Sequence, residues 1–225
     1  NGSNYLQKNA AMNALMSSVD NPEVTKALLE KTEDPFWGIR LQAMNTLGTY
    51  TGDDIVPILQ RAMDLAKNDP ESKVRRAGLK FVRGVDEDDL ENEGGAQAGS
   101  LKEKVLETLY DCIRDSSYGV LTDALGALAS LDEQAALTQA KTLEKEKNSK
   151  IISAVGALYM DLEQPGAVEY VSEKLAQMNA GFEKQAKDIT NSMLKFYVDL
   201  GVIDKHEYLK QKQVLDNTSI QNIFF

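Results

Sequence analysis

The chain has 225 residues, of which 42% are hydrophobic, and it carries a formal net charge of −10. This charge and the scattering of the basic residues argue against nucleic acid as a partner, and the absence of an apolar run of about 18 residues argues against a membrane span. A single cysteine, Cys112, and a single histidine, His206, exclude an internal disulfide and a zinc site built from histidine and cysteine.

The first part of the chain is predicted to form five helices. Their expected ranges are 4–18, 22–31, about 35–48, 52–66 and 70–83, because apolar residues recur at helical spacing in each. The third helix has the clearest pattern. Asp34 is expected to cap its N-terminus and Pro35 to occupy its first position, while Ile39, Ala43 and Leu47 share one face.

An acidic segment follows the fifth helix. Residues 85–99 combine aspartate, glutamate and glycine with few apolar residues, so we predict a flexible, solvated loop. An ordered calcium site is the less favoured interpretation, because the segment lacks the spacing of acids and the final glutamate of an EF-hand loop.

The remaining sequence is also predicted to be helical. Expected ranges are 101–114, 116–130, 132–147, 149–162, 165–178 and 180–200. A last helix and an apolar tail, together residues 204–225, are expected to cap the C-terminal end. No segment alternates polar and apolar residues with the period of a strand, so we predict no sheet.

Several strings recur along the chain. Asp34-Pro35-Phe36-Trp37-Gly38-Ile39-Arg40 and Asp69-Pro70-Glu71-Ser72-Lys73-Val74-Arg75 share Asp-Pro, three variable residues, a β-branched aliphatic residue and arginine, and they begin 35 residues apart. Residues 115–120 repeat the string without proline or arginine. Helix-pair repeats of this length indicate an α-solenoid. We therefore predict an all-α fold in which residues 1–225 form a single α-solenoid domain of roughly 10–12 helices in antiparallel pairs.

The repeats also supply the candidate functional residues. Arg40 and Arg75 are expected to form a ladder that bonds aspartate or carbonyl groups of the neighbouring repeat, and ligand binding is the less favoured interpretation. Phe36 and Trp37 are expected to pack between repeats, and they would be candidates for an interface if they were exposed. Cys112 is expected to be a packed structural residue. We predict no catalytic, cofactor-binding or metal-binding residue, because H-E-x-x-H, G-x-S-x-G, C-x-x-C and a glycine-rich phosphate loop are all missing.

Two resemblances follow from these strings. The helix pairs with Asp-Pro-x-x-x-[Val/Ile]-Arg resemble HEAT repeats over nearly the whole chain. The string that begins at Asp34, with Ala43 and Leu47-Gly48 after it, resembles the opening of the helical C-terminal region of gluzincin aminopeptidases of the aminopeptidase N type, particularly bacterial ones. This narrower resemblance covers about fifteen residues. The zinc-binding and substrate motifs of those enzymes, H-E-x-x-H and G-x-M-E-N, do not occur here.

The resemblance implies that this chain is a fragment that follows a catalytic domain. In that family the helical domain closes over the zinc site of the upstream domain and restricts substrates to peptides. The implied partners are the upstream domain and peptides or proteins along a concave face, with zinc only in the upstream domain, and the implied location is the bacterial cytoplasm or periplasm. Two alternatives stay open: a free-standing HEAT-repeat adaptor for protein–protein interaction, and an accessory of the HEAT-like lyase type that assists bilin attachment.

Overall fold

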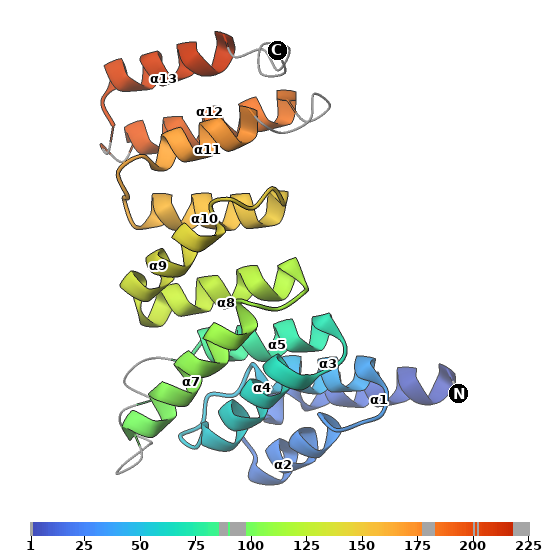
Figure 1. Cartoon of the computed structure of the whole chain (residues 1–225). Coiled ribbons are helices and arrows are strands. Elements are labelled where there is room, and N and C mark those ends of the chain that lie inside the picture. The colour runs from blue at the N-terminus through green and yellow to red at the C-terminus, as the bar shows by residue number, and fades with distance from the viewer. Residues whose placement is uncertain are drawn as a thin grey trace. The chain divides into compact units, whose positions relative to one another are not determined.

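The computed structural model describes residues 2–85, 90, 98–176, 183–199, 201 and 203–217. These residues form twelve α-helices and one short 3-10 helix, and no strand occurs among them. The all-α prediction is therefore confirmed for the described chain (Figure 1). The predicted apolar tail after residue 217 and most of the predicted acidic loop lie outside the described residues.

The contacts divide the chain into two compact units, residues Asn1–Gln139 and Ala140–Phe225. The first unit contains α1 (Gly2–Leu15), η1 (Met16–Ser18), α2 (Pro22–Lys31), α3 (Trp37–Leu47), α4 (Val56–Asn68), α5 (Ser72–Arg83), α7 (Ala98–Cys112) and α8 (Tyr118–Leu131). The boundary falls within α9 (Glu133–Leu143). The second unit contains α10 (Ser149–Asp161), α11 (Ala167–Ala176), α12 (Glu183–Asp199) and α13 (Lys205–Asn217).

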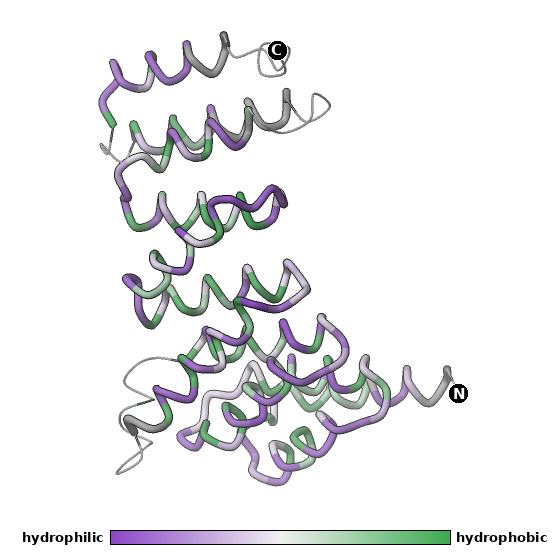
Figure 2. Tube along the Cα trace, viewed as in Figure 1, coloured by the Kyte–Doolittle hydropathy of each residue, from purple (hydrophilic) through white to green (hydrophobic). Residues whose placement is uncertain are grey.

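Within the first unit, α3, α5 and α8 lie side by side (Figure 1). Each of these helices also packs against the helix that precedes it in the chain: α3 against α2, α5 against α4, and α8 against α7. Fully buried side chains fill the space between the helices of each pair, including Leu28, Ile39, Leu59, Leu79 and Leu109. The hydrophobic residues recur along the helices instead of forming one block, as the colouring of the trace shows (Figure 2). This is the pattern of a helix that buries one face and exposes the other.

The second unit is a run of helices in which α10 packs on α11, α11 on α12 and α12 on α13. Ile151 and Val155 bury one face of α10. Two tyrosines join α10 to α11, since the ring centroids of Tyr159 and Tyr170 are 5.4 Å apart. The Tyr159 hydroxyl donates a hydrogen bond of 2.5 Å to a carboxylate oxygen of Glu144, and burial raises the pKa of Tyr170 to about 12.

Helix α3 begins at Trp37, two residues later than predicted. Asp34 is not its N-cap, and Pro35 is not its first residue. Instead, Oδ1 of Asp34 accepts a hydrogen bond of 2.9 Å from the N–H of Phe36. This is a side-chain turn of the kind that aspartate readily forms with the backbone two residues ahead. It satisfies that N–H before the helix starts, so the helix is set back to Trp37.

The same turn precedes α5 and α8. Oδ1 of Asp69 accepts from the N–H of Glu71 at 2.9 Å, and Oδ1 of Asp115 accepts from the N–H of Ser117 at 2.7 Å. Each helix then begins at the third residue after its aspartate. The recurring aspartate therefore forms a turn between the two helices of a pair.

Candidate functional site: an arginine ladder and a basic helix face

Arg40 links two of these turns. Its Nε and Nη2 donate hydrogen bonds to the two carboxylate oxygens of Asp69, at 2.6 and 2.9 Å, across 29 residues of sequence. Its Nη1 donates to the backbone oxygens of Asp34 and Pro35, at 2.9 and 3.2 Å. Side-chain exposure is only 11% for Arg40 and 2% for Asp69. Such a two-pronged, largely dehydrated pair fixes geometry as well as charge.

Arg75 repeats this arrangement one helix pair later. Its Nη2 donates to Oδ1 of Asp115 at 2.9 Å, and its Nε lies 2.8 Å from Oδ2 of the same residue. Its Nη1 donates to the backbone oxygens of Asp69 and Pro70, at 2.8 and 3.3 Å. Arg40 and Arg75 are each the sixth residue after a turn aspartate. The sixth residue after Asp115 is the buried Leu121, so the series does not continue into α8.

These contacts are made with the carboxylate and carbonyl groups that the sequence interpretation named for Arg40 and Arg75. Nearly every nitrogen of the two guanidinium groups faces an oxygen of the protein. In Arg40, the hydrogen bond to Asp69 raises the pKa of the guanidinium, and burial opposes this effect. Guanidinium groups bonded in this way have few N–H donors left for a ligand. The ladder therefore holds consecutive helix pairs together.

The aromatic pair before and at the start of α3 is more exposed than expected. Phe36 is 43% exposed. It precedes the helix, and its ring lies edge-on to Tyr5, with the ring centroids 4.9 Å apart. Trp37 is half-buried, and Nζ of Lys73 in α5 lies 5.0 Å from its ring centroid. Trp37 therefore lies beside the side of α5 that carries Lys73.

This side of α5 was missed in the sequence analysis, where the basic residues were described as scattered. Lys73, Arg76, Lys80 and Arg83 all lie on α5 and are all exposed. Because they are three, four and three residues apart, they share one side of the helix. We call these four residues the α5 basic face. The spacing in the sequence was the signal that could have revealed it.

Helix α8 supports one side of the α5 basic face. Nε of Arg76 donates a hydrogen bond of 2.6 Å to Asp123, and this bond raises the pKa of Arg76. Two glycines of α8 leave room for the arginines. A Cβ on Gly119 would lie 3.3 Å from Cδ and Nε of Arg76, and a Cβ on Gly126 would lie 3.5 Å from Nη1 of Arg83. Both guanidinium groups thus lie against α8.

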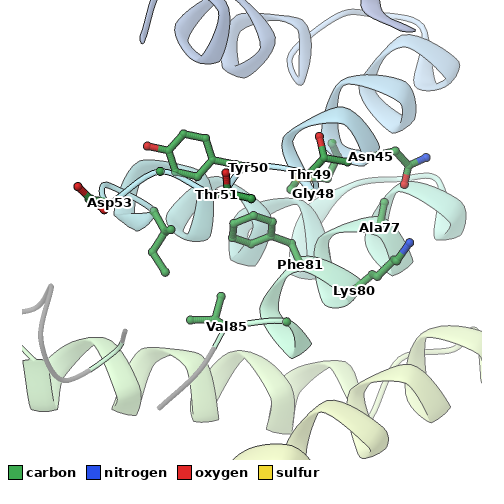
Figure 3. A pocket seen from close by; sticks show the side chains of 14 residues that line it. Asn45, Gly48, Thr49, Tyr50, Thr51, Asp53, Ala77, Lys80, Phe81 and Val85 are labelled. Atoms are coloured by element: carbon green, nitrogen blue, oxygen red, sulfur yellow. The ribbon is translucent and has the colours of Figure 1, made fainter. Parts of the chain in front are cut away.

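The surface between α3 and α5 is hollowed. One hollow has a volume of about 350 Å³ and is lined by Leu41, Asn45, Lys73, Arg76, Ala77, Leu79, Lys80, Arg83 and Asp123. A second, of about 380 Å³, lies at the C-terminal ends of the two helices (Figure 3). In that view Phe81 reaches from α5 toward the loop that carries Tyr50 and Thr51. The two hollows share Asn45, Ala77 and Lys80, so they adjoin along α5.

Other chemistry has little support in the described residues. Cys112 is buried, as expected, and burial raises the pKa of its thiol to about 11. Nowhere in the described ranges do three histidine, cysteine, aspartate or glutamate side chains gather as metal ligands would. None of the described helices is long and apolar enough to cross a membrane. Comparison of the chain with protein-family models, curated proteins and solved structures gave no match.

Proposed function

We propose that this chain is a HEAT-like α-solenoid domain and that it serves as the non-catalytic, helical C-terminal domain of a zinc aminopeptidase. In this role it closes over the active site of an upstream catalytic domain and limits substrates to peptides. The zinc and the catalytic base belong to that upstream domain. This chain contributes rigid support and a surface that contacts polypeptide.

The observation that carries the proposal is the ladder of Arg40 and Arg75. Asp34 and Arg40 belong to the string that resembles these enzymes, whereas Asp69 and Arg75 belong to the string that resembles HEAT repeats. In the first unit they join one helix pair to the next. Such bonds would fix the rotation of each pair against its neighbour, and the curvature of a solenoid follows from that rotation. A rigid stack of this kind is suited to covering another domain.

The test begins with the coding sequence upstream of Asn1. The proposal expects an H-E-x-x-H motif with a downstream glutamate there. The catalytic region should then be produced with and without the present chain and assayed on aminoacyl-p-nitroanilides and on peptides of increasing length. We expect no hydrolysis by the present chain alone. We expect activity from the joined protein, with a preference for peptides that weakens when this chain is removed.

Two results would contradict the proposal. One is an upstream sequence without a zinc-binding motif, which would favour the free-standing HEAT-repeat adaptor. The other is a catalytic region whose activity and length preference are the same with and without this chain, because a domain that closes over an active site must change access to it.

A further inference from the structure

We infer that the α5 basic face, together with Trp37 and Leu41 of α3, is a binding surface for an extended, carboxylate-rich segment of a polypeptide. This inference goes beyond the proposed function. It requires no upstream catalytic domain, because every residue in it belongs to α3, α5 and α8 of the first unit.

The charge pattern gives the first reason. The protein carries a net charge of −10, yet four cations follow one side of a single helix. Neighbouring like charges three or four residues apart on a helix repel one another. Among the described residues, Asp123 provides an ion pair to Arg76, and none forms an ion pair with Lys80 or Arg83. The cations are therefore arranged for a negative charge that comes from elsewhere.

The contrast with the ladder gives the second reason. The guanidinium groups of Arg40 and Arg75 are largely buried and bonded to Asp69 and Asp115, so both arginines serve the fold. Arg76 follows Arg75 directly in sequence but points to the surface, where its side chain is 51% exposed. Its bond to Asp123 and the space over Gly119 hold its guanidinium in place before any ligand arrives. A cationic side chain that is already held in place loses less conformational entropy when a ligand binds than a mobile one does.

The dimensions indicate the shape of the ligand. From Lys73 to Arg83 the helix rises about 15 Å, which is the length of about five residues of extended chain. Alternate residues of an extended chain lie about 6.6 Å apart on one side, close to the about 5–6 Å between side chains three or four residues apart on a helix. Acidic residues at alternate positions of an extended peptide would therefore match the cations of α5.

The surroundings favour a polypeptide over a nucleic acid. Leu41 and the half-buried ring of Trp37 border the cations, so the surface offers apolar contacts between the charges. A nucleic acid carries a charge on every backbone unit and is repelled over a longer range by a strongly acidic protein. A short acidic segment needs only a local match.

The experiment uses the 225-residue chain and a fluorescein-labelled octapeptide of alternating glutamate and serine. Binding is measured by fluorescence anisotropy in about 20 mM and about 200 mM salt, because screening weakens contacts between exposed charges. We expect saturable binding that weakens with salt, and a loss of about tenfold or more in the Lys80→Glu/Arg83→Glu variant. The matched control, Lys26→Glu/Lys104→Glu, makes the same change in net charge at exposed residues of α2 and α7. It should bind within about twofold of the parent.

A second variant separates binding from folding. Lys80→Gln/Arg83→Gln removes the charges without adding acids to the last turn of α5, and it should keep the helical circular dichroism of the parent while binding more weakly. Trp37 is the single tryptophan and lies beside Lys73. Its emission should therefore change on addition of an unlabelled peptide.

Three outcomes would overturn the inference. They are the absence of saturable peptide binding at low salt, an equal loss in the Lys26→Glu/Lys104→Glu control, and binding of an oligothymidylate of eight nucleotides as tight as that of the peptide. The last outcome would assign the surface to polyphosphates. None of these measurements depends on a zinc enzyme, so a failure here is distinct from a failure of the proposed function.

Discussion

Replacing Arg40 by methionine is the most direct test of the ladder. Methionine keeps much of the apolar stem and removes the guanidinium group. The change leaves the carboxylate of Asp69, only 2% exposed, without its charged partner. Removal of one partner from a buried ion pair typically costs about 3–5 kcal/mol, because the remaining charge stays dehydrated and unpaired. We expect a loss of this size in the free energy of unfolding of the first unit.

Arg76→Met is the matched control. The same chemical change is made in the neighbouring helix, and an arginine–aspartate bond of 2.6 Å is lost in both variants. Arg76 and Asp123 are 51% and 35% exposed, so water replaces the lost partner. Exposed pairs contribute about 0–1 kcal/mol, and the control should lose no more than this.

A double variant tests the reason for the loss. In Arg40→Met/Asp69→Asn the asparagine can still accept the N–H of Glu71, so the turn before α5 is kept. No buried charge is left without a partner. We therefore expect the double variant to be more stable than Arg40→Met alone, although it lacks one more charged group.

Unfolding in urea should be followed by the emission of Trp37. As the single tryptophan, it reports on the first unit alone. If Arg40→Met lost no more stability than Arg76→Met, or if the double variant were less stable than Arg40→Met, the argument from burial would be refuted. The ladder would then contribute no more than a surface ion pair.

Three further predictions concern single positions. Burial acts to raise the pKa of the Asp34 carboxyl, but a backbone N–H and nearby ammonium groups lower this pKa on balance below its ordinary value of 3.8. The ionised carboxylate therefore stabilises the fold above pH 3.8, and this stabilisation is lost as the pH falls through the lower pKa of the folded state. In Asp34→Asn, the free energy of unfolding in urea should therefore change less between about pH 5 and pH 2 than it does in the parent. In Gly78→Ala the new Cβ would lie 2.4 Å from the backbone oxygen of Ala62, and this overpacking should lower the free energy of unfolding by about 1–3 kcal/mol. In Gly126→Ala the new Cβ would lie 3.5 Å from Nη1 of the long Arg83 side chain, and the better helix propensity of alanine should raise the free energy of unfolding by up to about 1 kcal/mol. Thermal melts of the two variants check both values. The thiol of Cys112, with its pKa raised to about 11 by burial, should react with Ellman's reagent at pH 8 only when the protein is unfolded.

Local patterns were sufficient to predict the helices. Apolar residues at helical spacing, as at Ile39, Ala43 and Leu47, predicted a buried face, and all three are buried. The prediction succeeds because the hydrogen bonds of a helix join residues only four apart in sequence, and the residues on its buried face follow from the period of 3.6 residues. The recurring Asp-Pro-x-x-x-[Val/Ile]-Arg string also identified the arginines that contact carboxylate and carbonyl groups. The solenoid, the enzyme family and the partners stay predictions.

A local side-chain turn decided where α3 starts, whereas tertiary structure decided which charges are paired. The sequence favoured Asp34 as a cap, but the competing side-chain turn to Phe36 set the helix back. The recurring string singled out Arg75, but it did not show that Arg75 would bond to the turn at Asp115 while the neighbouring Arg76 lies on the surface. Their partners are 40 and 47 residues away. Pairing depends on dehydration and on distances across the packed helices, and neither is fixed until the helices have come together.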